Sequence, residues 1–360
     1  MTGSLSIALD AMGGDRAPEM VVKGANIARQ RFPNVRFEFF GDERRVKPLL
    51  DRYAALRKAS NVVHTDKVVA GDDKPSVALR AGRGSSMRLA IDAVHSGVAA
   101  GVVSAGNTGA LMAMSKFVLK TLPGIDRPAI ASFFPTLRGE SVMLDLGANL
   151  SCDADNLVQF AVMGRVFART VLGILKPTVG LLNVGSEEVK GHEAVREAFA
   201  ILRASSLPGE FHGFVEGDDI ARGTVDVIVT DGFTGNVALK TAEGTAELIV
   251  HYLRAALKRS LLGRLGAILA SGAFRVLKRK LDPRTLNGGV FLGLNGVVVK
   301  SHGGADALGF ASAIDLAIDM GQSDMIAHIL ADRAGVSSLP DPSDAAENPA
   351  GAAAAQAVAS

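Results

Sequence analysis

The chain has 360 residues, enough for one large α/β domain or two smaller ones with a sizeable core. Hydrophobic residues make up 48% of the sequence, which is typical of a packed globular protein and excludes a disordered one. The 39 basic and 37 acidic residues leave a net charge of +2, and aromatic residues amount to 5% without any tryptophan. Neither the charge nor the supply of stacking side chains favours nucleic acid as a partner.

Cys152 is the single cysteine, which excludes an internal disulfide and fits a reducing compartment. The first residues lack the charged and apolar segments of a secretory signal. No uncharged apolar run reaches the roughly 18 residues that a membrane-spanning helix needs. We therefore expect a cytoplasmic protein.

Short apolar segments alternate with segments of helical periodicity along most of the chain. Strands are expected at residues 6–10, 35–40, 62–63, 99–103, 129–135, 141–145, 178–183 and 225–230, and as a glycine-bent pair within 288–300. Helices are expected at 21–31, 45–59, 77–96, 111–119, 155–172, 192–204 and 305–331, and from 237 onward. This alternation is typical of βαβ units, so we predict an α/β fold with a largely parallel sheet between helical layers.

The pattern predicts one αβα domain over residues 1–335, followed by a disordered tail over 336–360 that is rich in Ala, Ser, Pro and Asp. Residues 251–284 differ from the rest. They are basic, with Asp282 as their single acid, and enclose the apolar segment 261–270. Two helices that meet near 271–272 would form a protruding hairpin with an apolar tip and basic flanks. It is interpreted either as a core or dimer-packing element or as a contact for a membrane surface or an acidic partner.

The segment 104–110, Ser-Ala-Gly-Asn-Thr-Gly-Ala, joins a buried strand to a helix through glycines. Backbone N–H groups at such a helix N-terminus suit an anion, above all phosphate, and small residues let it approach closely. Taken alone, the segment fits an ordinary strand-to-helix turn as well as it fits an anion-binding site. Similar polar loops follow several other strands, and in open α/β sheets such loops gather at the carboxyl ends of the strands, where ligands bind.

Several familiar catalytic motifs are missing. The sequence has no P-loop, no dinucleotide fingerprint after a strand, no H-E-x-x-H zinc motif and no G-x-S-x-G nucleophile elbow. Nothing marks a base for Cys152, so a structural cysteine is favoured over a nucleophile. Lys190 is a cation inside one of the loops that could hold an anion, and its alternative interpretation is an inert surface lysine.

The motifs together resemble the bacterial phosphate acyltransferase family of phospholipid synthesis, over residues 7 to about 331. The matching segments, in family order, are 7–15, 85–87, 104–110, 145–149, 159–164, 183–188 with 190–191, 230–236 and 301–304. The resemblance implies transfer of an acyl group from acyl carrier protein to inorganic phosphate, without a cofactor or metal. It also implies a three-layer αβα fold similar to isocitrate and isopropylmalate dehydrogenases and to phosphotransacetylase, a homodimer, and peripheral association with the inner membrane face.

This chemistry needs little from the protein. Phosphate is the nucleophile and a thiolate is the leaving group, so the enzyme must hold phosphate against the thioester and stabilise an oxyanion. Lys190 and Asn107 are the expected catalytic residues. Expected phosphate or substrate contacts are Asp10, Gly13, Gly14, Ser104, Gly106, Thr108, Gly109, Asp145, Asn149, Asp231, Thr234, Gly235, Asn236, His302 and Gly303. Expected membrane or carrier-protein contacts are Lys258, Arg259, Leu262, Arg264, Ile268, Lys278 and Arg279.

Two other functions stay open at this point. One is a phosphotransacetylase-like enzyme that uses acyl-coenzyme A, and the other is a non-catalytic lipid-binding or membrane scaffold protein. A dehydrogenase of the similar fold is disfavoured, because the dinucleotide fingerprint is missing.

Overall fold

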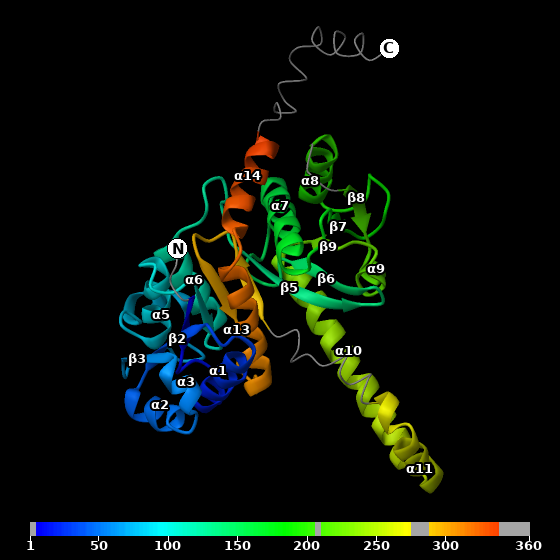
Figure 1. Ribbon diagram of the computed structural model, residues 1–360. Coiled ribbons are helices and arrows are strands. Elements are labelled where there is room, and N and C mark those ends of the chain that lie inside the picture. Colours follow the sequence, from blue (N-terminus) through cyan, green and yellow to red (C-terminus); the bar gives the residue numbers. More distant parts are fainter. Residues whose placement is uncertain (1–4, 206–209, 275–287, 338–360) are drawn as a thin grey trace.

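The computed structural model describes residues 5–205, 210–274 and 288–337 (Figure 1). Its strands are β1 (Ser6–Asp10), β2 (Arg36–Gly41), β3 (Ser60–His64), β4 (Gly101–Ser104), β5 (Ala129–Thr136), β6 (Gly139–Leu144), β7 (Thr178–Leu182), β8 (Glu210–Val215), β9 (Val227–Val229), β10 (Gly289–Leu292) and β11 (Val297–Lys300). Its helices are α1 (Glu19–Arg31), α2 (Glu43–Leu50), α3 (Ala54–Lys58), α4 (Pro75–Ala81), α5 (Ser86–His95), α6 (Thr108–Leu119), α7 (Ala154–Val171), α8 (Glu193–Ala204), α9 (Gly217–Arg222), α10 (Gly232–Lys258), α11 (Leu261–Leu269), α13 (Ala307–Gly321) and α14 (Met325–Ser337).

All these strands join one sheet in the order β3-β2-β1-β4-β11-β10-β5-β6-β9-β7-β8. The strands from β3 to β11 pair in parallel, and so do β6, β9, β7 and β8. Three antiparallel pairings, β11 with β10, β10 with β5 and β5 with β6, separate the two parallel groups. The predicted, largely parallel sheet is therefore confirmed, but the second group runs opposite to the first. The polar loops that follow the strands therefore fall into two sets, one at the carboxyl ends of each parallel group.

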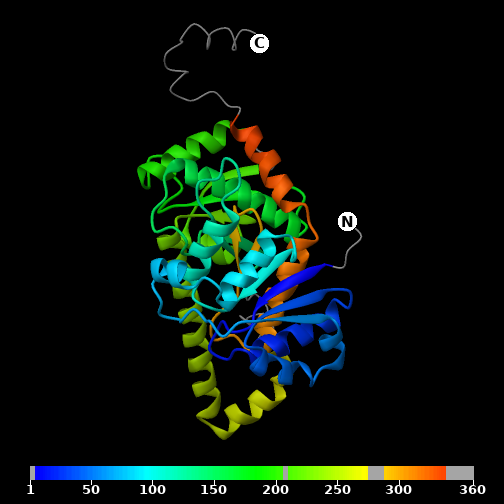
Figure 2. The ribbon, with the colours of Figure 1, turned by 90° about the vertical axis from the view of Figure 1, so that its left-hand side faces the viewer.

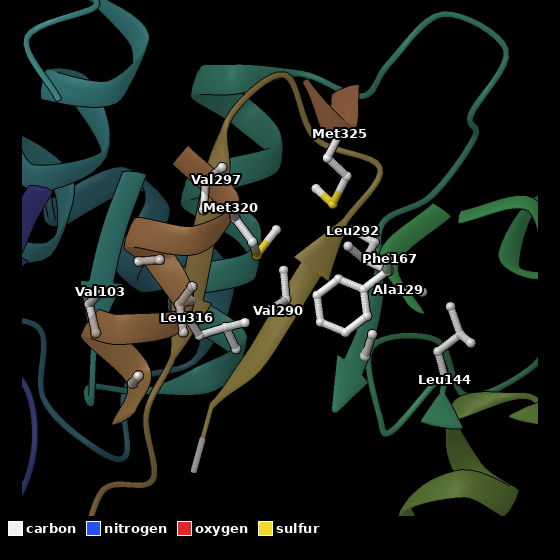
Figure 3. Close-up of a cluster of buried hydrophobic side chains, with 14 of the residues drawn as sticks. Val103, Ala129, Leu144, Phe167, Val290, Leu292, Val297, Leu316, Met320 and Met325 are labelled. Carbon is white, nitrogen blue, oxygen red and sulfur yellow. The ribbon is translucent and has the colours of Figure 1, made fainter. Parts of the chain in front are cut away.

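Alternate residues along the strands pack into two different hydrophobic clusters, as the pleat of a sheet requires. Val103 of β4 and Leu144 of β6 join the cluster that contains α1, α7 and α13, whereas their neighbours Val102 and Met143 join the cluster that contains α5 and α6. Figure 3 shows part of the first cluster, with Phe167 of α7 near strands β5 and β10. Helices thus cover both faces, which is the predicted three-layer αβα arrangement.

Three predicted helices are each divided in two. The segment 45–59 forms α2 and α3, 77–96 forms α4 and α5, and 305–331 forms α13 and α14. The α4–α5 break has a local cause, since the hydroxyl of Ser85 accepts a hydrogen bond from Arg88 N and caps α5. α14 continues to Ser337, two residues into the predicted tail, and the rest of that tail lies outside the described residues.

The protruding hairpin is present in part. Figures 1 and 2 show α10 leaving the body of the molecule with α11 at its far end. α10 continues unbroken to Lys258, and the chain turns at 259–260, earlier than predicted; α11 then ends at Leu269, close to the predicted break. Residues 275–284 lie outside the described residues. No helix in the described ranges is long and apolar enough to cross a membrane.

Two helical glycines allow a test of how tightly α7 packs on the sheet. A Cβ atom at Gly164 of α7 would lie 2.7 Å from both Leu144 Cδ2 and Val227 Cγ1, whereas one at Gly244 of α10 would meet nothing within 4 Å. We expect Gly164→Ala to lower the free energy of unfolding by about 1–2 kcal/mol, because overpacking outweighs the gain in helix propensity. The control, Gly244→Ala, should raise it by up to about 1 kcal/mol. Denaturant unfolding measures both changes, and equal effects at the two positions would contradict the packing described.

Candidate active site

Asp10 ends β1 with its carboxylate buried. On the neighbouring strand β4, the Ser104 hydroxyl donates a hydrogen bond to Asp10 Oδ2 at 2.6 Å, and it accepts one from Gly106 N at 3.0 Å. Met12 N donates to Asp10 Oδ1 at 3.3 Å. Burial raises the pKa of Asp10, and these hydrogen bonds partly offset that effect. The carboxylate thus ties together the turns that follow β1 and β4.

Glycines let these turns come into backbone contact. A Cβ atom at Gly13 would overlap Asp10 Oδ2 and lie 2.8 Å from Gly106 N, so no other residue fits there. Gly14 has a φ of +101°, which other residues rarely adopt, and its Cβ would lie 3.2 Å from the Gly303 carbonyl oxygen. That carbonyl accepts a hydrogen bond from Asp15 N at 3.0 Å, which joins the loop after β11 to the loop after β1.

Asn107 holds the start of α6. Its side-chain oxygen accepts a hydrogen bond from Ala110 N at 2.9 Å, and its Nδ2 donates to the carbonyls of Gly71 and Asp73 at 2.8 and 3.1 Å. Both amide donors are therefore engaged in joining α6 to the loop before α4. The adjacent Thr108 is exposed, and Gly109 faces Pro75. The geometry gives Asn107 a positioning role, while the catalytic role expected from the sequence stays a prediction.

Lys300 is a residue that the sequence reasoning missed. It ends β11, lies opposite Ser104 of β4 in the parallel register, and is half-buried. Its Nζ donates to the Ser301 carbonyl. Burial lowers the pKa of Lys300 to about 8, while the charges of Asp10 and Asp15 act in the opposite direction. The signal was a lysine at the end of an apolar strand, directly before the 301–304 motif.

His302 lies two residues after Lys300 and is exposed. Its Nδ1 accepts a hydrogen bond from Gly304 N, 3.1 Å away. With Gly303 it belongs to the loop that follows β11. Asp10, Ser104, Gly106, Lys300 and Gly303 are called the Asp10 cluster below; they lie at the carboxyl ends of β1, β4 and β11.

Asp145 forms a second centre after β6. Its buried carboxylate accepts hydrogen bonds from five N–H groups of Ile130, Gly147, Ala148 and Asn149, at 2.7–3.2 Å. Burial raises the pKa of Asp145, and these bonds partly offset it. The loop 145–149 and the start of β5 are therefore organised around one carboxylate.

The start of α10 packs on the same loop. Gly232 N donates to the Asn149 carbonyl at 2.8 Å, and a Cβ atom at Gly235 would overlap the Asp145 carbonyl oxygen. Asp231 caps α10, accepting from Thr234 N at 2.9 Å and from its hydroxyl at 2.8 Å. Asn236 lies beside Gly147, whose φ is +126°. Asp145, Asn149, Asp231, Thr234, Gly235 and Asn236 thus form one group, the Asp145 cluster.

Lys190 lies in the loop after β7, in the same half of the sheet as the Asp145 cluster. Its exposed ammonium group pairs with Glu187 at 2.8 Å, and the hydrogen bond to that carboxylate, followed by its charge, raises the pKa of Lys190. Asn183 Nδ2 donates to the carbonyls of Lys190 and Gly185, at 3.1 and 3.2 Å, and holds the loop closed. Lys190 is therefore a charged, accessible group on an ordered loop. The structure places it and the Asp10 cluster in halves of the sheet that run in opposite directions.

No group of three or more His, Cys, Asp or Glu side chains within residues 5–205, 210–274 and 288–337 is placed to hold a metal ion. Cys152 is half-buried near the Asp145 cluster. Burial and the charges of Asp145 and Asp231 raise the pKa of its thiol to about 12. A thiol with this pKa is protonated at neutral pH and is a poor nucleophile.

Residues 5–328 match a family model described as fatty acid synthesis protein. A phosphate acyltransferase of Rhodospirillum centenum (strain ATCC 51521 / SW) is 71% identical over 320 residues, which are 89% of this chain and 90% of the relative. The chain therefore belongs to the fatty acid synthesis protein family. A phosphate acyltransferase of Rhodospirillum rubrum is 62% identical over 320 residues, or 89% and 92% of the two chains. These relatives confirm the resemblance inferred from the motifs, and with it the expectation of an enzyme of the acyltransferase class.

Solved structures confirm the fold class. A phosphotransacetylase from Streptococcus pyogenes matches with a TM-score of 0.61 and 18% identity, over 88% of this chain and 94% of that one. The EutD phosphotransacetylase from Staphylococcus aureus matches with a TM-score of 0.58 and 17% identity, over the same shares. Identities this low establish a shared architecture, not a shared substrate.

The state of the Cys152 thiol can be tested directly. At pH 8 we expect iodoacetamide to alkylate Cys152 in the folded protein at least about 100-fold more slowly than in the urea-unfolded chain, because the thiolate fraction falls as the pKa rises from roughly 8.5. Mass spectrometry of quenched time points gives both rates for the same residue. Comparable rates would show that the thiol is neither buried nor suppressed by the two carboxylates.

Proposed function

We propose that the protein transfers an acyl group from an acyl-(acyl carrier protein) thioester to inorganic phosphate, and that the acyl phosphate formed feeds phospholipid synthesis. A phosphate oxygen attacks the thioester carbonyl, the C–S bond breaks, and the carrier protein leaves as its thiol. The observation that carries this proposal is the set of glycine-lined turns after β1, β4 and β11, in a chain of the fatty acid synthesis protein family. Such turns suit a phosphate that reacts directly, without an acyl-enzyme.

The identity of the acyl donor is the point to test. The same fold is compatible with the alternative function, a phosphotransacetylase-like enzyme that uses acyl-coenzyme A as donor. Purified protein is given acyl carrier protein and acyl-coenzyme A with the same acyl chain, and release of free thiol is followed with and without phosphate. We expect phosphate-dependent release from the carrier protein with the higher kcat/KM. Release from coenzyme A alone would favour the phosphotransacetylase-like alternative, and no release from either donor would favour a lipid-binding scaffold.

Lys190 is proposed to neutralise the developing negative charge of the oxyanion or phosphate. We expect Lys190→Ala to lower turnover by about one to three orders of magnitude, the scale of losing one positioned electrostatic group. The fold should survive, because this side chain is exposed and its recorded ion pair is with the equally exposed Glu187. Steady-state kinetics at saturating phosphate measure the loss, and Glu187→Gln, which removes the partner but not the cation, is the control. A near wild-type rate would make Lys190 an ordinary surface lysine.

The α10–α11 arm is proposed to contact the inner membrane face or the acidic carrier protein. Lys258, Arg259 and Arg264 are on the described part of the arm, and residues 248–274 contain no acidic side chain. Basic residues near an anionic membrane contribute about 1 kcal/mol each. Lys278 and Arg279 lie outside the described residues. The proposed homodimer would use the exposed apolar residues of α10, such as Ile249 and Tyr252.

Leu262 and Ile268 of α11 are 83% and 69% exposed, so they are not core residues of the described chain. We expect the double variant Leu262→Glu with Ile268→Glu to stay folded and dimeric but to stop floating with anionic vesicles. The matched control is Leu175→Glu, an 85% exposed leucine in the loop before β7, which should float like the wild type. Dissociation of the double variant into monomers would instead assign the tip to a dimer interface.

A further inference from the structure

Three neighbouring strand ends bring Lys300, Ser104 and Asp10 into one row. Lys300 of β11 is the register partner of Ser104 of β4, and residues at paired positions project to the same face of a sheet. Ser104 in turn donates its hydroxyl hydrogen bond to Asp10 of β1. Ser301 N donates to the Ser104 carbonyl at 2.9 Å, which fixes the loop after β11 against the same strand end. Lys300 is therefore held by strand pairing on a rigid element.

Lys300 lies in the field of the Asp10 and Asp15 carboxylates, but it makes no ion pair of 4 Å or less with either. Among the described residues its Nζ has the Ser301 carbonyl as hydrogen-bond partner and forms no ion pair. Asp10 has its own donors, Ser104 and Met12, so it does not need the lysine for its hydrogen bonds. Burying an ammonium group is costly, and burial lowers the pKa of Lys300.

Two further features favour an anion beside this lysine. α6 begins directly after the turn that follows β4, and its N-terminal N–H groups add positive potential there. Gly13, Gly14 and Gly106 let the turns after β1 and β4 pack closely around Asp10 and Ser104, so backbone groups of these turns lie beside the strand ends. Asp10 and Asp15 face Lys300 from β1 and from the loop after it, and their charges oppose an anion. Lys300 is thus the charge that decides whether the turns attract one.

We propose that Lys300 binds the attacking phosphate, and that the Asp10 cluster is the phosphate subsite of the enzyme. The proposal rests on the proposed function and deepens it, because it names a residue of this chain that holds the nucleophile.

The test compares Lys300→Met, which removes the charge, with Lys300→Arg, which keeps it. With acyl donor saturating, we expect Lys300→Met to raise the KM for phosphate at least tenfold with little change in the KM for the acyl donor, and Lys300→Arg to stay within about threefold of the wild type. The control is Lys116→Met, an exposed lysine of α6 whose Nζ also donates to a carbonyl, that of Asp126 at 3.4 Å. An unchanged KM for phosphate in Lys300→Met overturns the proposal.

A pH profile separates binding from a purely structural role. Between pH 7.5 and 9 phosphate is mostly dianion, so its own titration contributes little. Loss of a proton from Lys300 removes its charge, and kcat/KM for phosphate in the wild type should therefore fall as pH rises through about 8. In Lys300→Arg, which stays charged, this fall should move to higher pH. An identical profile in both proteins overturns the assignment, even if Lys300→Met does not fold.

Phosphate binding is also measured without any acyl donor. Phosphate should raise the melting temperature of the wild type and of Lys300→Arg, but not that of Lys300→Met. If the wild type turns over neither donor, the proposed function fails, while this difference still supports Lys300 as an anion-binding residue. An equal phosphate shift in Lys300→Met overturns the proposal whatever the activity.

Discussion

The reversal of strand direction in the middle of the sheet determines where every candidate residue lies. β10 is antiparallel to both of its neighbours, and β6 is antiparallel to β5, so the strands from β6 to β8 run opposite to those from β3 to β11. Polar loops follow the carboxyl ends of parallel strands, and the molecule therefore has two such loop systems. The Asp10 cluster belongs to one, and the Asp145 cluster with Lys190 belongs to the other.

The two loop systems are built in the same way. Each has a buried aspartate at or just after a strand end, with hydrogen bonds from nearby donors and a pKa raised by burial. In each, a glycine packs so closely against the aspartate that a Cβ atom would overlap it: Gly13 against Asp10, and Gly235 against Asp145. A buried carboxylate is stable when its hydrogen bonds are satisfied, and the bonds in turn fix the loop that supplies them. Both aspartates are therefore organisers of loop geometry, whatever contact they make with substrate.

The two lysines differ because their surroundings differ. Lys190 is exposed beside Glu187, which stabilises its charged form and keeps it a cation through neutral pH. Lys300 is enclosed by strand ends and glycine-lined turns, where burial favours the neutral form. The first side chain extends from an ordered surface loop, and the second is held among the strand ends by the pairing of β11 with β4.

Local pattern in the sequence determined most strands and helices, the layer arrangement and the loops that carry the candidate residues, but it missed β8 and α9. Asp10, Ser104, Asp145, Asp231 and the glycines beside them were identified because each stands next to an apolar strand. Helix breaks at 51–53, 82–85 and 322–324 were missed. Only the tertiary structure decided the strand order, the opposite direction of the two halves and the partners of each polar group, because these depend on pairings between residues far apart in the chain. Lys300 shows the physical reason: its burial and its place beside Ser104 come from the pairing of β11 with β4, almost two hundred residues earlier, and no local pattern records that contact.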